Sequence, residues 1–214
     1  MFGFNFGTGT AIWKDPAMIG MAALLFLYGS GKFEIMSKNL ITGKFLELGT
    51  GPGTQAIQLA KRNFEVAATD ISSNAIKNAK KLSNKIHFLT DDILNSQLLN
   101  HEFDFIFDRG IFHVFDISQR PQYVKQIKRI LDNNGILFLK CMSVDEKNIS
   151  DNDLAHKLSK QEIVDIFNDD FDIESIDNSV FHGTLAITLK ALFAVLKKNP
   201  YDILSKNNLL TQIK

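Results

Sequence analysis

One short stretch limits the possible folds of this chain more than any other. Residues 45–54 have the sequence Phe-Leu-Glu-Leu-Gly-Thr-Gly-Pro-Gly-Thr. The apolar run over 44–48 predicts a buried strand, and the helical periodicity over 54–62 predicts a helix. Glycine stands at three alternate positions between them. Such a strand-turn-helix unit is typical of nucleotide-type sites in α/β sheets.

The glycines Gly49, Gly51 and Gly53 indicate that a ligand closely approaches the backbone. Glycine reaches positive φ without a steric penalty and leaves no Cβ between the main chain and a bound molecule. The free N–H groups of the new helix favour an anionic group. Dinucleotide sites use Gly-x-Gly-x-x-Gly, whereas this turn has Gly-x-Gly-x-Gly, and Thr54 takes the next position.

Glu47, inside the predicted strand, is a second difference from a dinucleotide site. A carboxylate is costly to bury unless it meets a donor or a cation, and it would fit poorly beside a pyrophosphate. It suits a ligand with a positively charged amino acid head group. Together, Glu47 and the glycines resemble motif I of the class I S-adenosylmethionine-dependent methyltransferases.

The resemblance implies a single Rossmann-like α/β domain. Its sheet would have seven mostly parallel strands with an antiparallel last strand, and helices on both faces. It also implies S-adenosyl-L-methionine as the cofactor, held by Glu47, Gly49, Thr50, Gly51 and Gly53.

The remaining pattern agrees with such a sheet. Apolar runs predict strands at 64–69, 86–90, 103–107 and 136–142, and helices at 73–82 and 118–131. A capping box at 159–162 opens another helix, and a turn is expected at 133–135. Residues 171–181 and 185–196 predict a terminal hairpin, as the last two strands require.

An acidic residue ends the predicted second strand. Asp70 lies 21 residues after Gly49, where a carboxylate can accept from both hydroxyls of a ribose. The adjacent Ile71 belongs to the same expected site. Alternatively, Asp70 or Ser72 caps the following helix. We expect ribose binding for Asp70 and capping for Ser72.

The third strand is followed by Asp91, Asp92 and Ile93. In the resembled family an acidic residue followed by an apolar one contacts the adenine at this point. Asp92 with Ile93 matches that pattern. We include Asp91 in the cofactor site, and a solvated turn is its alternative role.

The predicted fourth strand ends in Asp108, Arg109 and Gly110, with His113 close behind. Ligands of open α/β sheets bind beyond the carboxyl ends of the strands, where the strand order reverses, so this turn should face the glycines. We expect Asp108 to contact the cofactor, and Asp108, Arg109 and His113 to form the reacting centre. Asp108 or His113 could take a proton, or Arg109 could steady a thiolate. A structural histidine is the alternative for His113.

This turn, with Arg120 and Tyr123 after it, resembles the thiopurine S-methyltransferase-like branch. The resemblance covers residues 44–140. It implies methyl transfer to a small-molecule nucleophile such as a thiol. Enzymes that methylate glutamine or the amines of bases carry Asn/Asp-Pro-Pro-Tyr here, whereas this chain has Asp-Arg-Gly-Ile.

The composition limits the kinds of binding partner that we expect. The chain has 24 basic and 24 acidic residues, so no bulk charge attracts nucleic acid or a membrane surface. A single cysteine, Cys141, allows no disulfide within the chain and indicates a reducing compartment, which we take as the cytoplasm. No Cys/His cluster has metal-ligand spacing, so no metal is expected. No pattern indicates an oligomeric state.

We expect three parts: an N-terminal arm and helix (1–43), a methyltransferase core (44–197) and a C-terminal tail (198–214). About a dozen apolar residues after Pro16 fall short of the ~20 that span a bilayer. This segment is either a helix packed on the sheet or, with Trp13, a lid over the active site.

Two rival functions remain open. The chain could bind the cofactor without turnover, or it could be an NAD-dependent oxidoreductase. Glu47 and the glycine spacing disfavour the oxidoreductase.

Overall fold

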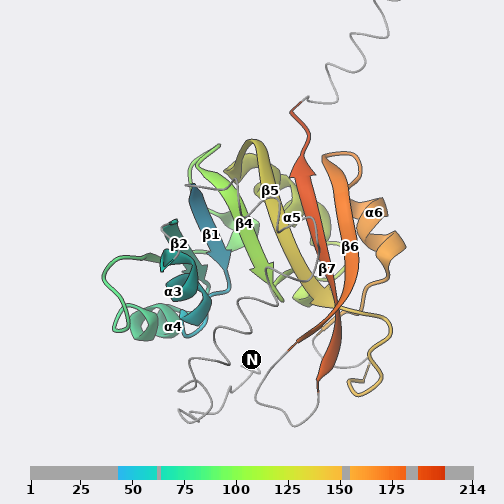
Figure 1. The fold of residues 1–214 in the computed structure, drawn as a ribbon, viewed down its shortest axis with the longest axis horizontal. Coiled ribbons are helices and arrows are strands. Elements are labelled where there is room, and N and C mark those ends of the chain that lie inside the picture. The colour runs from blue at the N-terminus through green and yellow to red at the C-terminus, as the bar shows by residue number, and fades with distance from the viewer. Residues whose placement is uncertain (1–42, 62–63, 151–154, 182–187, 201–214) are drawn as a thin grey trace, which may run out of the picture.

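A computed structural model describes residues 43–61, 64–150, 155–181 and 188–200. Within these ranges seven strands form one sheet in the order β3-β2-β1-β4-β5-β7-β6 (Figure 1). The strands are β1 (Lys44–Leu48), β2 (Glu65–Asp70), β3 (His87–Thr90), β4 (Phe103–Arg109), β5 (Leu131–Met142), β6 (Phe171–Phe181) and β7 (Leu189–Lys198). Six run parallel, and β7 is antiparallel to its neighbours β5 and β6. The predicted fold class is confirmed.

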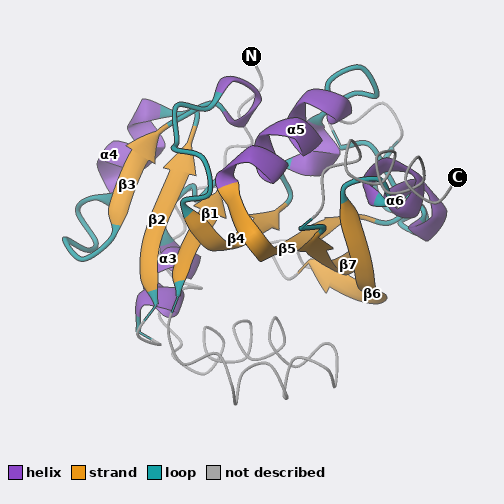
Figure 2. Ribbon diagram, turned by 90° about the horizontal axis from the view of Figure 1, so that it is seen from above, coloured by secondary structure: helices purple, strands orange, loops and turns teal. Residues whose placement is uncertain are grey.

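Helices cover both faces of the sheet, which explains why its central strands are nearly continuous apolar runs. The helices are α3 (Thr54–Ala60), α4 (Ser73–Ala79), α5 (Arg120–Ile130) and α6 (Lys160–Phe167), with 3₁₀ turns η2 (Ile93–Asn95) and η3 (Phe112–Val114). α3 and α4 pack into a phenylalanine-rich layer with Phe45, Phe107 and Phe138. α5 and α6 bury their apolar sides on the opposite face, where Figure 2 shows both on one side of the sheet.

Local sequence signals set several element boundaries. The predicted capping box is present, because Ser159 and Glu162 exchange side-chain to backbone hydrogen bonds at the start of α6. Asn134 takes a left-handed φ of 65° in the turn predicted at 133–135. β5 begins five residues earlier than predicted, because Leu131 already pairs with Phe103 before a register shift leads to the pairing of Ile136 with Phe105.

The strand order reverses between β1 and β4, which places two turns opposite each other at the carboxyl edge of the sheet. We call residues 49–53 the glycine turn and residues 108–112 the Asp108 turn. The predicted arm with Trp13 and most of the predicted tail lie outside the described residues, so the three-part division stays a prediction. No helix in the described ranges has the length and apolarity to cross a membrane.

Candidate active site

The three glycines of the glycine turn all adopt left-handed φ values, 62° at Gly49, 51° at Gly51 and 79° at Gly53. Their surroundings differ. A Cβ at Gly49 would lie 2.1 Å from Cδ1 of Ile111, and one at Gly53 would lie 3.0 Å from the Cβ of Ala79. A Cβ at Gly51 would meet no atom of the described residues within 4 Å. Gly49 and Gly53 therefore serve internal packing, while Gly51 borders a space that no described residue fills.

Glu47 lies buried beneath this turn and is 4% exposed. Its Oε2 accepts from the Thr50 hydroxyl at 2.6 Å and from the Ala56 N–H at 2.9 Å, which ties the turn to α3. Burial raises the pKa of Glu47 to about 7, against the opposing effects of these two hydrogen bonds and the charge of Arg109. A positively charged ligand nearby would favour the ionised form.

Asp70 reaches across from the tip of β2 and holds the glycine turn. One carboxylate oxygen accepts from the Gly51 N–H at 2.9 Å and the other from the Ser72 N–H at 2.8 Å. Asp70 is only partly buried, and each of its oxygens has a second lone pair for a ligand hydroxyl. Ser72 caps α4 as predicted, accepting from the Ala75 N–H. Ile71 is 73% exposed beside Asp70.

The two acids after β3 have different partners. Asp92 caps η2, accepting from the Leu94 N–H at 3.0 Å and the Asn95 amide at 3.1 Å. One oxygen of Asp91 accepts from the Gln97 N–H, and the other is buried with no hydrogen-bond partner among the described residues. Ile93 packs into the core and is 7% exposed. The geometry thus favours Asp91 over Asp92 as an acceptor for a ligand amine.

Asp108 is fully buried, and four donors surround its carboxylate. It accepts from the N–H groups of Gly110 at 2.9 Å, Ile111 at 2.7 Å and Phe112 at 2.9 Å, and from the Tyr123 hydroxyl at 2.7 Å. Burial raises its pKa to about 6 despite these bonds. The expectation that Asp108 takes a proton from a substrate does not fit this geometry, because each of its oxygens already accepts two hydrogen bonds from the protein.

His113 is also held by the scaffold. Its Nδ1 accepts from the Met142 N–H at 3.1 Å, and burial lowers its pKa to about 4. The neutral ring therefore carries its proton on Nε2, which makes it a donor rather than a base. This geometry favours the structural alternative over proton acceptance.

Arg109 points to the other face of the sheet from Asp108, because successive residues of a strand alternate. Its guanidinium lies 5.7 Å from the centre of the Phe181 ring. The side-chain carbonyl of Gln55, in the amide orientation that satisfies its neighbours, accepts from Arg109 Nε at 3.1 Å and Nη1 at 3.2 Å. Arg109 thus links the helix after the glycine turn to β6.

Sequence reasoning missed three residues here: Gln55, Phe181 and Lys140. Lys140 sits beside Arg109 in the β4–β5 register, and its Nζ lies 5.4 Å from the centre of the same Phe181 ring. A signal for Lys140 was available, since it is the one charged residue in the apolar run 136–142. Nothing in the sequence pointed to Phe181, which reaches the site only through the pairing of β6 with β7.

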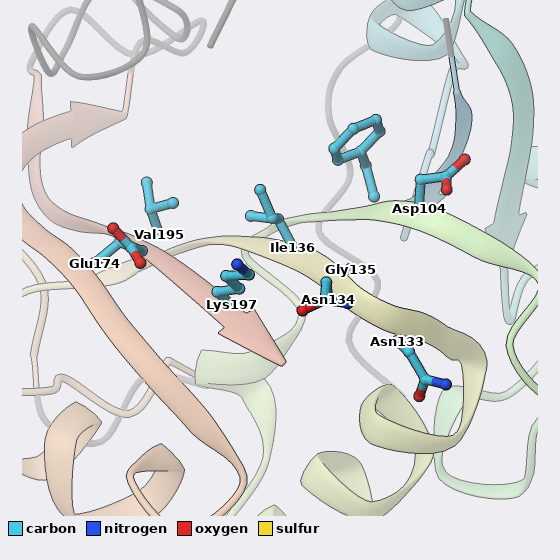
Figure 3. Close-up of a pocket in the computed structure, with 9 residues that line it drawn as sticks. Asp104, Asn133, Asn134, Gly135, Ile136, Glu174, Val195 and Lys197 are labelled. Carbon is cyan, nitrogen blue, oxygen red and sulfur yellow. The ribbon is translucent and has the colours of Figure 1, made fainter. Parts of the chain in front are cut away.

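A hollow of about 510 Å³ lies elsewhere, at the amino ends of β4 and β5 (Figure 3). Its lining includes Asp104, Asn134 and Ile136, with Lys197 near the end of the antiparallel β7. Because ligands of such sheets bind at the opposite, carboxyl edge, this hollow is separate from the candidate site.

Residues 45–135 match a family model described as a methyltransferase domain. A probable thiol methyltransferase 2 of Arabidopsis thaliana is 26% identical over 115 residues, which cover 51% of this chain and 50% of that protein. A release factor glutamine methyltransferase of Flavobacterium psychrophilum is 31% identical over 139 residues, 54% of this chain and 44% of that protein. The matched part thus spans about half the length of each relative.

Solved structures share the fold. One is a 1,6-didemethyltoxoflavin-N1-methyltransferase of Burkholderia thailandensis, solved with bound 1,6-didemethyltoxoflavin and S-adenosylhomocysteine. It superimposes with a TM-score of 0.63 at 16% identity, covering 91% of this chain and 84% of that one. At this identity the likeness establishes the Rossmann-like methyltransferase fold.

Proposed function

We propose that this protein is a methyltransferase that transfers the methyl group of S-adenosyl-L-methionine to a small-molecule nucleophile. The methyltransferase domain match and the shared fold support the reaction class. The observation that carries the proposal is the glycine turn, where no described atom would lie within 4 Å of a Cβ at Gly51. Two acids accept hydrogen bonds from this turn, the buried Glu47 and the partly exposed Asp70.

The residues of this turn fit the proposed cofactor. The backbone at Gly51 permits close approach, and the spare lone pairs of Asp70 suit ribose hydroxyls. The Asp91 oxygen that has no partner among the described residues suits an exocyclic amine, and Glu47 suits a positively charged amino group. When bound, the sulfonium of this cofactor supplies a methyl group that is already activated.

The acceptor is a small nucleophile such as a thiol. The two relatives are named for different acceptors, a thiol and a protein glutamine. The strand-tip sequence Asp108-Arg109-Gly110 favours the first, because glutamine methylation is expected with an Asn/Asp-Pro-Pro-Tyr turn at this place.

The chain contributes mainly by positioning the acceptor. Holding a nucleophile in line with an activated methyl group can lower a barrier by several kcal/mol, on the order of 7 in favourable cases. Asp108 and His113 are engaged in the scaffold, so no strong base is assigned. A thiol of low pKa needs none, and Arg109 orients the anionic or thiolate acceptor.

Calorimetry with S-adenosylhomocysteine and with NAD tests the cofactor. Binding of the first and not the second is expected, and the reverse would establish the oxidoreductase alternative. A methyl-release assay over a panel of thiols then separates an enzyme from a binding protein without turnover. Absence of turnover with every thiol, despite tight cofactor binding, would contradict the proposed acceptor.

The Arg109→Lys variant tests the role of Arg109. It keeps the charge but loses the planar fork, so methyl transfer should fall while affinity for S-adenosylhomocysteine holds. Lys61→Met, an exposed change just beyond α3, is the control. A lower melting temperature with an unchanged rate per folded molecule would mean that Arg109 is structural.

A further inference from the structure

Lys140 is a buried cation that the proposed cofactor site does not use. It is 8% exposed on β5, between Leu139 and Cys141, which are both fully buried. Burying an ammonium group is costly unless an anion accompanies it. No ion pair between two described side chains includes Lys140.

The surroundings of Lys140 add positive charge instead of compensating it. Arg109 is its direct partner in the β4–β5 register, so the two side chains share one face of the sheet. Both cationic groups lie over Phe181, at 5.4 Å for Lys140 and 5.7 Å for Arg109. An aromatic face offsets part of the cost of burying a cation, but less than a carboxylate does. Burial and the charge of Arg109 lower the pKa of Lys140 to about 8.

The acid of the cofactor side, Glu47, lies on the same face, and its charge acts on Arg109 rather than on Lys140. Its Oε2 accepts hydrogen bonds from Thr50 and Ala56, and burial raises its pKa to about 7 against the effect of these bonds. Lys140 is therefore the cation of this cluster that has no ion pair with a described acid.

This cluster lies at the carboxyl edge, on the β4–β5–β6 side of the point where the strand order reverses. The cofactor contacts proposed above come from β1, β2 and β3. We propose that Lys140 and Arg109, with Phe181 as an apolar platform, form a subsite for a carboxylate group of the methyl acceptor. The assignment rests on the proposed function and narrows it to acceptors that are anionic.

Benzoate and benzamide are suitable probes, since they have nearly the same size and differ in charge. Calorimetry should show benzoate binding to the wild-type protein saturated with S-adenosylhomocysteine at least tenfold more tightly than benzamide. Lys140→Met should abolish that selectivity, and Lys140→Arg should largely retain it. Lys190→Met, on the exposed side of β7, is the matched control and should behave as wild type.

Melting temperatures show whether a loss of selectivity in Lys140→Met comes from a loss of folding. Because Lys140 is buried without an anion among the described residues, Lys140→Met should melt no lower than wild type. Equal binding of the two probes by wild type, or unchanged selectivity in Lys140→Met, would overturn the subsite. If S-adenosylhomocysteine fails to bind while benzoate selectivity depends on Lys140, the proposed function fails and the subsite stands as an anion site.

Discussion

The glycine turn and the Asp108 turn follow neighbouring strands and face each other, yet the carboxylates that hold them differ in burial and in the number of donors around them. In the glycine turn the acid comes from the next strand, as Asp70, and it is only partly buried beside the space at Gly51 that no described residue fills. In the Asp108 turn the acid belongs to the turn itself and is fully buried among four donors.

The difference shows that an acid at a strand tip can serve a ligand or the protein's own backbone. The deciding quantity is how many donors the fold already supplies. Asp70 has one backbone donor on each oxygen and keeps capacity for a ligand. Asp108 fixes the turn and thereby the strand end from which Arg109 projects.

The largest expected effect is on stability, in Asp108→Ala. Removing this carboxylate leaves three N–H groups and the Tyr123 hydroxyl without their acceptor, so the free energy of unfolding should fall by about 4 kcal/mol. Urea denaturation measures it. Asp104→Ala, on the same strand, removes one bond to the Lys44 N–H and should cost less than about 1 kcal/mol. Similar losses in both variants would show that the four donors of Asp108 stabilise the fold no more than the single donor of Asp104.

Gly51→Val should instead act on binding. Its side chain would enter the space at Gly51 that no described residue fills, so affinity for S-adenosylhomocysteine should fall at least about a hundredfold, or ~2.7 kcal/mol. Valine is strained at the left-handed φ of 51°, so the melting temperature should also fall, while the far-UV spectrum of the folded protein stays near normal. Gly49→Ala is the contrasting variant, because its methyl group meets Ile111 and should lower the melting temperature. Retained binding by Gly51→Val would mean that no ligand approaches this turn.

Asp70→Ala should weaken binding of S-adenosylhomocysteine by about 1.5 to 3 kcal/mol, since a charged acceptor is lost. Calorimetry measures the affinity and thermal melting checks the fold. Glu65→Ala, at the exposed start of the same strand, is the control and should bind as wild type. Unchanged affinity in Asp70→Ala would show that Asp70 only holds the turn and the start of α4.

The smallest effect is a pH dependence from Glu47. Its folded pKa is raised to about 7 from 4.5, so its contribution to stability is fully present below pH 4.5 and is lost as pH rises through 7. A positively charged ligand favours the ionised form, so affinity for S-adenosylhomocysteine should rise between pH 6 and 8, by at most about tenfold per unit. In Glu47→Gln this pH dependence should be absent, both from the affinity measured by calorimetry and from the melting temperature. A wild-type affinity that does not change over this range would show that the ionisation of Glu47 is not coupled to ligand binding.

The sequence by itself determined the features that arise within a few residues. The glycine turn, the Ser72 cap, the capping box at Ser159 and the succession of strands along the chain all depend on local conformational preferences and periodicity. The same local signals placed Asp70, Asp91 and Arg109 at strand tips, and therefore at one edge of the sheet.

Only the tertiary structure decided what those side chains do. Asp108 became a scaffold residue because Tyr123, fifteen residues later, donates to it, and Asp91 rather than Asp92 kept an oxygen with no partner among the described residues. Lys140 and Phe181 joined Arg109 because β4, β5 and β6 are brought together in one sheet. A local pattern fixes where a residue lies along its strand, but its hydrogen-bond partners and burial depend on pairings between distant segments.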